Sequence, residues 1–250
     1  MAGHSKWANI QHRKGRVDAK RGKMWTKLSR AIIVAAQQGG GDPDSNFKLR
    51  KAIDDAKAVS MPKDNIARAI KKGTGEIAGG PMEEIVYEGY GPHGVAVMCD
   101  ILTDNRNRTA PELRKIFEIN GGKLAENGAV SWIFERKGLF TIENGKIEEE
   151  DLMESALEAG AEDIKNDGDN FEVTCDPDKY TDVSDAFANA EIECLSRQVT
   201  RIPSNTVKLQ ATEARQVLKL LEALDDHDDI QSVSANFDVS DEVMAEISAE

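Results

Sequence analysis

The spacing of hydrophobic residues changes at a glycine-rich segment, residues 73–81, and this change is the strongest constraint on the fold. Before the segment, apolar residues recur every three to four positions, which is typical of amphipathic helices. After it, short stretches rich in β-branched residues alternate with helical stretches, as in α/β domains. The sequence therefore predicts a multi-domain α+β protein that begins with a small N-terminal three-helix domain.

The three helices of this first domain are predicted over residues 17–38, 46–59 and 62–72. Pro62 suits the first turn of a helix, because the N–H group that proline lacks would have no partner there. Gly73 ends the third helix and begins the linker.

The rest of the chain predicts two α/β domains of split-βαβ, ferredoxin-like type, one inserted in the other. The expected elements are strands 82–90 and 94–103, a helix opened by a Thr109–Glu112 capping box and running to Asn120, strand 130–135, helix 148–159, a hairpin around 166–169, helix 178–189, strand 194–200, strand 206–210, helix 211–224 and strand 230–237. The β-α-β segments 94–135 and 206–237 would complete one sheet. The predicted domains are 1–78, 79–135 plus 204–240, and 136–203.

Charge is divided unevenly along the chain. Residues 1–75 carry 17 Lys and Arg against 6 Asp, whereas residues 76–250 carry 15 Lys and Arg against 39 Asp and Glu. Residues 1–30 hold nine basic side chains and one acidic side chain, Asp18. A basic segment on an acidic body is typical of a protein that binds a polyanion while repelling non-specific partners.

The basic residues of the first predicted helix form a row, here called the basic stripe: Arg16, Lys20, Lys23, Lys27 and Arg30. They fall within about 80° of one another when each residue advances by about 100° around the helix. Fixed positive charges of this kind bind phosphate backbones, and Trp7 and Trp25 are available to stack or anchor. The candidate nucleic-acid-binding residues are Lys6, Trp7, Arg13, Lys14, Arg16, Lys20, Arg21, Lys23, Lys27 and Arg30. The alternative is a solvated helix face beside a core tryptophan.

A second candidate anion site lies in the segment Asp104–Thr109. Arg106 and Arg108 precede the predicted capping box, where free amides at a helix N-terminus would add to their charge. The alternative is a loop in which Asp104 and the neighbouring asparagines pair with the arginines and satisfy the backbone.

Nothing in the sequence indicates catalysis. Gly89–Gly94 matches G-x-G-x-x-G, but a strand follows it instead of a helix, which favours a structural hairpin. His227 lies in the acidic run Asp225–Asp229, for which a solvated loop is favoured over a metal site. The three cysteines fit neither a disulfide framework nor a zinc site, and no apolar run is long enough to span a membrane. The sequence predicts a cytoplasmic protein that is not an enzyme and has no cofactor, metal, membrane or small-molecule partner.

Several motifs resemble the YebC/PmpR family across nearly the whole chain. They are Ala2–Trp7 with Asn9-Ile10, Asp18 and Arg21-Gly22-Lys23, then Met61-Pro62-x-x-Asn65-Ile66-x-Arg68-Ala69-Ile70-x-Lys72-Gly73, Tyr87–Pro92, Asp104–Thr109 and Val130-x-Trp132-x-Phe134. The resemblance implies a helical N-terminal domain followed by two α/β domains. His93 and Ala125-Glu126 depart from the family pattern, at positions that concern local turn geometry.

The resemblance implies a regulatory protein and leaves two partners open. One is promoter DNA, because bacterial members are described as transcriptional regulators. The other is the ribosome and its RNA, because the family includes the mitochondrial translational activator of cytochrome c oxidase subunit I and factors that ease translation of proline runs. A third alternative is a protein-interaction scaffold whose basic segment docks on an acidic protein.

Overall fold

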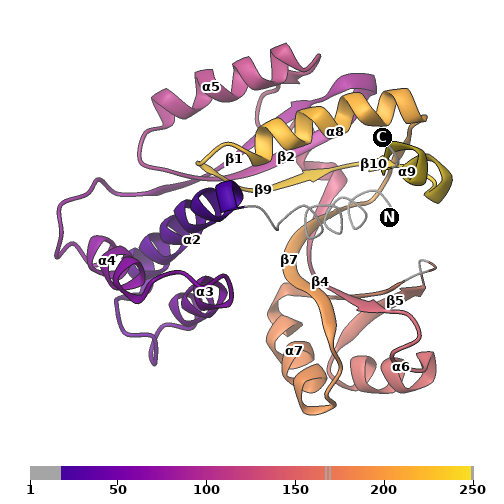
Figure 1. Ribbon diagram of the computed structural model, residues 1–250, viewed down its shortest axis with the longest axis horizontal. Coiled ribbons are helices and arrows are strands. Elements are labelled where there is room, and N and C mark those ends of the chain that lie inside the picture. The colour runs from indigo at the N-terminus through magenta and orange to yellow at the C-terminus, as the bar shows by residue number, and fades with distance from the viewer. Residues whose placement is uncertain (1–17, 167, 169, 249–250) are drawn as a thin grey trace.

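The computed structural model describes residues 18–166, 168 and 170–248, and its first elements are three helices that pack on one another. These are α2 (Asp18–Gly39), α3 (Phe47–Ala58) and α4 (Lys63–Gly73), which confirm the predicted helices (Figure 1). Their apolar faces bury Ile32, Leu49 and Ile66 in a shared core. The side chain of Asn46 caps α3 by accepting a hydrogen bond from the N–H of Leu49 at 3.1 Å, and it donates to the carbonyl of Ala35 at 2.8 Å.

The first sheet has the strand order β3-β1-β2-β9. Its strands are β1 (Glu83–Tyr90), β2 (Ala96–Thr103), β3 (Lys123–Leu124) and β9 (Ile230–Ala235), all antiparallel to their neighbours. Helices α5 (Arg106–Ile119) and α8 (Ala211–Asp225) lie on one side of this sheet (Figure 1), and Phe117 and Leu220 belong to the core beneath them. A single 3₁₀ turn (Pro92–Gly94) joins β1 to β2, so Gly89–Gly94 is part of a hairpin. His93 adopts the left-handed φ of 59° in this turn, a conformation that glycine takes more easily.

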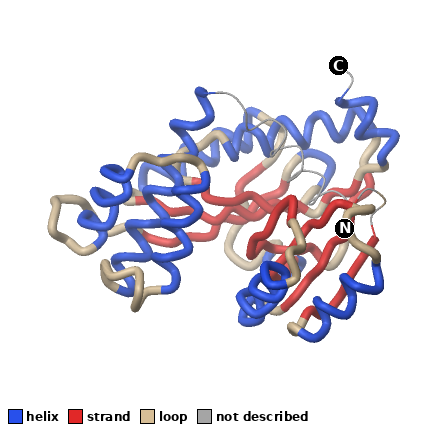
Figure 2. The backbone as a smooth tube through the Cα atoms, turned by 60° about the horizontal axis from the view of Figure 1, so that its bottom comes forward, coloured by secondary structure: helices blue, strands red, loops and turns tan. Residues whose placement is uncertain are grey.

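The second sheet has the order β5-β6-β4-β7. Its strands are β4 (Phe134–Glu143), β5 (Ala161–Asn166), β6 (Asn170–Cys175) and β7 (Cys194–Pro203), covered by α6 (Glu149–Glu158) and α7 (Tyr180–Asn189). Phe140 stacks on Tyr180 with ring centroids 5.0 Å apart. Figure 2 shows the same layering from another direction, with helices outside the strands. The α+β fold class is confirmed, and the domain boundaries at 78, 135 and 203 stay a prediction.

Two strands that were predicted for the first sheet are shorter than expected over the predicted residues and belong to other sheets. Residues 130–135 begin with a 3₁₀ turn (Ser131–Ile133), and the strand that follows is β4 of the second sheet. Of residues 206–210, only β8 (Val207–Lys208) forms a strand, and it pairs in parallel with β10 (Phe237–Asp238) apart from the first sheet. The first sheet is therefore completed by β1 and β3 instead of these segments.

The physical reason for the first error is a buried carboxylate. Glu88 on β1 is 5% exposed, and it accepts hydrogen bonds from the N–H groups of Gly128, Val130 and Ser131 at 2.7–2.9 Å. Backbone groups that bind this side chain cannot also pair with a neighbouring strand. Burial by itself would raise the pKa of Glu88, but these three donors outweigh it and hold the pKa below its usual range.

We expect Glu88→Ala to lower the free energy of unfolding by about 3 kcal/mol at pH 7, because three backbone donors lose a charged acceptor. Urea denaturation of parent and variant measures this difference. The lowered pKa means that the contribution of Glu88 is complete above about pH 4.3, the ordinary glutamate value, and is lost as pH falls through the folded-state pKa. The parent and variant should therefore converge in acid. A constant difference down to about pH 2.5 would contradict this account.

Helix α9 (Asp241–Ser248) ends the described part of the chain and has no counterpart among the predicted elements. Its Val243, Met244 and Ile247 pack against the core beneath α8. Over the described residues, no helix is both long and apolar enough to cross a membrane.

Candidate nucleic-acid interface

Three members of the basic stripe on α2, Lys23, Lys27 and Arg30, face the loop that joins α8 to β9, here called the acidic loop (residues 225–229). Lys23 Nζ lies 3.1 Å from Asp226 Oδ1, and Lys27 Nζ lies 2.8 Å from Asp225 Oδ1. Arg30 forms an ion pair with Asp229. These three members of the stripe therefore have carboxylate partners about 200 residues away in the sequence.

Lys27 also supplies the positive charge that the C-terminus of α8 lacks. Helix α8 ends at Asp225 with no basic residue in its last turn, although the C-terminus of a helix carries negative partial charge. Asp225 and the capping residue Asp226 add two carboxylates at this unfavourable position. Lys27 Nζ donates to the carbonyl oxygen of Asp225 at 2.7 Å as well as to its side chain, so a lysine from α2 neutralises the end of α8.

Asp229 is the centre of the site and is 1% exposed. Besides Arg30, it accepts hydrogen bonds from Arg108 Nη2 at 3.0 Å and from the hydroxyls of Thr103 and Thr109. Burial would raise the pKa of Asp229, but Thr109, Arg108, Arg30 and Thr103 together lower it below its usual range. Asp229 is therefore ionised at neutral pH and fixes two arginines from different helices.

The second candidate site requires a correction. Helix α5 begins at Arg106, because Asn105 is its N-cap and accepts from the N–H of Arg108 at 3.2 Å. The predicted Thr109 capping box is wrong, and the two arginines lie in the first turn of the helix itself. Arg108 pairs with Asp104 and Asp229, whereas Arg106 is exposed and has no side-chain partner among the described residues. The Asp104–Arg108 pair agrees with the alternative interpretation, in which Asp104 pairs with the arginines, although the segment is helical from Arg106 onward.

A cavity of about 620 Å³ lies where these groups meet. Its lining includes Lys23, Arg30 and Arg108 as well as residues 226–229, so the structure brings two residues of the basic stripe and Arg108 together around the acidic loop. The expectation that residues 225–229 form a solvated loop is therefore wrong for Asp225 and Asp229. Their partners come from α2 and α5, and no local pattern indicates them.

Glu112, His227 and Asp229 in this cavity have the donor types of a metal site. His227 Nε2 lies 3.0 Å from Glu112 Oε2, and His227 Nδ1 accepts the N–H of Asp229 at 3.1 Å. The guanidinium groups of Arg30 and Arg108 already occupy the carboxylate of Asp229, and they would repel a divalent cation placed there. The donor set therefore fits an ion-pair network better than a cation.

The remaining candidates divide between the described and undescribed parts of the chain. Lys20 and Arg21 belong to the first turn of α2. Trp25 is half-buried against the helical core and donates to the carbonyl of Val59 at 3.3 Å, so it anchors α2 to α3. The other candidates lie outside the described residues: Lys6, Trp7, Arg13, Lys14 and Arg16.

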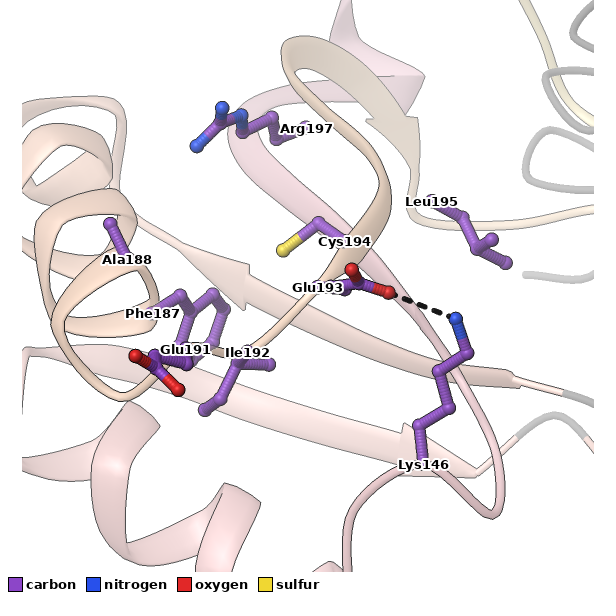
Figure 3. A pocket seen from close by; sticks show the side chains of 9 residues that line it. All are labelled: Lys146, Phe187, Ala188, Glu191, Ile192, Glu193, Cys194, Leu195 and Arg197. Carbon is purple, nitrogen blue, oxygen red and sulfur yellow. Dashed lines mark hydrogen bonds and ion pairs between the residues drawn. The ribbon is translucent and has the colours of Figure 1, made fainter.

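A cavity of about 570 Å³ beside α7 and the start of β7 has no comparable cluster of paired cations and carboxylates (Figure 3). Lys146 and Glu193 form an ion pair across it, with Nζ and Oε2 3.0 Å apart. Burial raises the pKa of the Cys194 thiol, although Arg197 opposes this shift. A neutral thiol is a weak nucleophile, so the lining does not resemble a catalytic site.

Two family models together match most of the chain. The model described as the TACO1/YebC protein N-terminal domain matches residues 5–76, and the model of the TACO1/YebC second and third domain matches residues 82–237. The chain is similar to "Probable transcriptional regulatory protein RB5500" of Rhodopirellula baltica, with 61% identity over 98% of this chain and 100% of the relative. It is 56% identical to a "Probable transcriptional regulatory protein" of Natranaerobius thermophilus, over 98% of this chain and 99% of the relative.

A solved structure has the same fold. It is the crystal structure of a conserved hypothetical protein, Aq1575, from Aquifex aeolicus, with a TM-score of 0.84 and 44% sequence identity. The match covers 94% of this chain and 98% of that one. The names of the two relatives support a regulatory role.

Proposed function

The chain belongs to the TACO1/YebC family, and from this premise we propose that it is a non-enzymatic, cytoplasmic regulator of transcription that binds duplex DNA through its basic N-terminal segment. The observation that carries the proposal is the row of carboxylates bound along α2. Three successive cations of the stripe each bind a carboxylate of the acidic loop, in the way that spaced cations bind successive phosphates.

The ion pairs differ in how readily a phosphate could replace the carboxylate. The Lys23 and Asp226 side chains are 47% and 63% exposed, so this pair is screened by water and contributes little. Asp229 is buried and satisfied by four side chains, so Arg30 is less free to exchange its partner than Lys23 or Lys27. We propose that phosphates replace Asp225 and Asp226 at the lysines while Arg30 keeps its partner.

The proposal predicts a strong dependence of binding on salt. If six basic residues contact duplex phosphates, log K should fall with log[salt] at a slope of about −5. Replacing Lys6, Arg13, Lys14 and Arg16 by alanine should reduce the slope to about −2, because about four contacts are lost. Fluorescence anisotropy with a labelled duplex across a range of KCl concentrations measures both slopes.

The matched control removes four cations from the acidic part of the chain by replacing exposed residues with alanine: Arg136, Lys165, Lys208 and Lys219. This variant should keep the slope of the parent. A parent slope near zero would rule out the proposed role of the basic segment.

Ribosomal RNA carries the same phosphates as DNA and is the alternative partner. A sucrose gradient of lysed cells at near-physiological salt compares the parent with the Lys6, Arg13, Lys14 and Arg16 variant. If only the parent travels with ribosomes, the translation function replaces the transcriptional one. If both stay at the top, promoter DNA is favoured. A complex that survives nuclease treatment and loss of these cations would instead favour the protein scaffold.

A further inference from the structure

The polar residues of the sequence motif 61–73 line a groove between α2 and α4. The apolar motif residues Ile66 and Ala69 are buried in the helical core, which explains why these two positions are apolar. Asn65, Arg68 and Lys72 follow one side of α4 at helical spacing and border a cavity of about 260 Å³ together with Ser29 of α2. We call this cavity the α4 groove.

Within the described part of the chain, no hydrogen bond or ion pair of the fold uses the side chains of Ser29, Asn65, Arg68 or Lys72. Their polarity is therefore not explained by capping or by salt bridges, in contrast to Lys23, Lys27 and Arg30 on the stripe. The linker passes closely over the Lys72 stem at Gly79, which limits the positions that this side chain can take.

The lining of the α4 groove has a single sign of charge. It holds two cations, a hydroxyl and an amide, and it has no carboxylate. The cavity beside the stripe is different, because Glu112, Asp226, Asp228 and Asp229 also line it. Two cations with no anion between them favour a bound anion, and the hydroxyl and amide of the groove can donate to its oxygens.

We infer that the α4 groove binds a backbone phosphate of the nucleic acid. The inference rests on the proposed function and adds a contact point on the described surface. The guanidinium of Arg68 and the ammonium of Lys72 neutralise the phosphate, and Ser29 and Asn65 fix its position by hydrogen bonds. Because its cations have no carboxylate partners among the described residues, this groove is available without rearrangement.

The test compares two pairs of substitutions on the same helix. Arg68→Gln with Lys72→Gln removes the charges of the groove, whereas Lys63→Gln with Lys71→Gln removes two charges from exposed positions outside its lining. The probes are a fluorescein-labelled DNA duplex and a labelled RNA hairpin, measured by anisotropy. The groove pair should weaken binding about tenfold and lower the magnitude of the salt slope by about 1 to 2. The control pair should weaken it less than about threefold.

A charge-conserving pair, Arg68→Lys with Lys72→Arg, should bind within about threefold of the parent because the number of neutralised phosphates is unchanged, which separates loss of charge from change of side-chain shape. Equal weakening by the groove and control pairs, or no weakening by either, would overturn the inference and leave the proposed function intact. If the parent binds neither probe, the proposed function fails and the inference fails with it.

Discussion

Asp229→Ala is expected to lower the free energy of unfolding by about 3–5 kcal/mol, the largest stability effect that the described contacts predict. The carboxylate is 1% exposed and joins α2, α5 and β2 through Arg30, Arg108 and Thr103. Its removal leaves two arginines, of which Arg30 is largely buried, and two buried hydroxyls without their shared acceptor. Urea denaturation at pH 7 measures the loss.

Asp228→Ala is the matched control, because Asp228 lies next to Asp229 but is exposed and has no side-chain partner among the described residues. It should change stability by less than about 0.5 kcal/mol. If the two variants differ by less than about 1 kcal/mol, Asp229 does not hold these elements together.

The pH dependence of the same site follows from the lowered pKa of Asp229. Stability that depends on the ionised carboxylate is complete above about pH 3.9, the ordinary aspartate value, and is lost as pH falls through the folded-state pKa. Asp229→Asn keeps the shape of the side chain without the titration. The difference in stability between parent and Asp229→Asn should therefore shrink in acid.

Local patterns in the sequence predicted the helices well, because their causes are local. Asn46 caps α3 from the adjacent position, and the apolar spacing of α4 places Ile66 and Ala69 in the core. The predicted start of α5 was wrong, although the residue that caps this helix is also adjacent to it in the sequence. Asn105 serves as the N-cap, while the hydroxyl of Thr109 contacts the distant Asp229.

The features that the sequence could not predict depend on residues far apart in the chain. Glu88 binds the backbone of residues 128–131 and prevents the predicted strand there. Asp18 is the only acidic residue among residues 1–30, yet Lys23, Lys27 and Arg30 have carboxylate partners in residues 225–229. The charge count located a basic helix and could not reveal that the chain supplies carboxylates that pair with it.

Neutralising the acidic loop with Asp225→Asn and Asp226→Asn is expected to tighten nucleic-acid binding by about tenfold. Lys23 and Lys27 bind these carboxylates in the free protein, so a phosphate must displace them before it reaches the lysines. The Lys23–Asp226 pair is exposed, whereas the Lys27–Asp225 pair is partly buried, with side chains 17% and 37% exposed. At up to about 1 kcal/mol for each pair, the two together correspond to a factor of about ten or more in affinity.

The control for general electrostatic repulsion is Glu149→Gln with Glu150→Gln on α6, which changes the net charge by the same amount at exposed positions without side-chain partners in the described chain. It should alter affinity by less than about threefold. The salt slope provides a second readout. Lys23 and Lys27 lose their carboxylate partners, although Lys27 keeps its hydrogen bond to the carbonyl of Asp225. Their charges can then release more counterions from the duplex, and the slope should become steeper by about 1 to 2.

The sign of this result decides what the acidic loop does. Tighter binding with a steeper slope means that the loop competes with phosphate. Only polyanions that bind several cations at once would then displace the loop from the stripe. Weaker binding means that the loop holds α2 in the orientation that binds nucleic acid. In that case, the α4 groove and the segment before α2 carry the phosphate contacts, and the ion pairs of the stripe serve the fold.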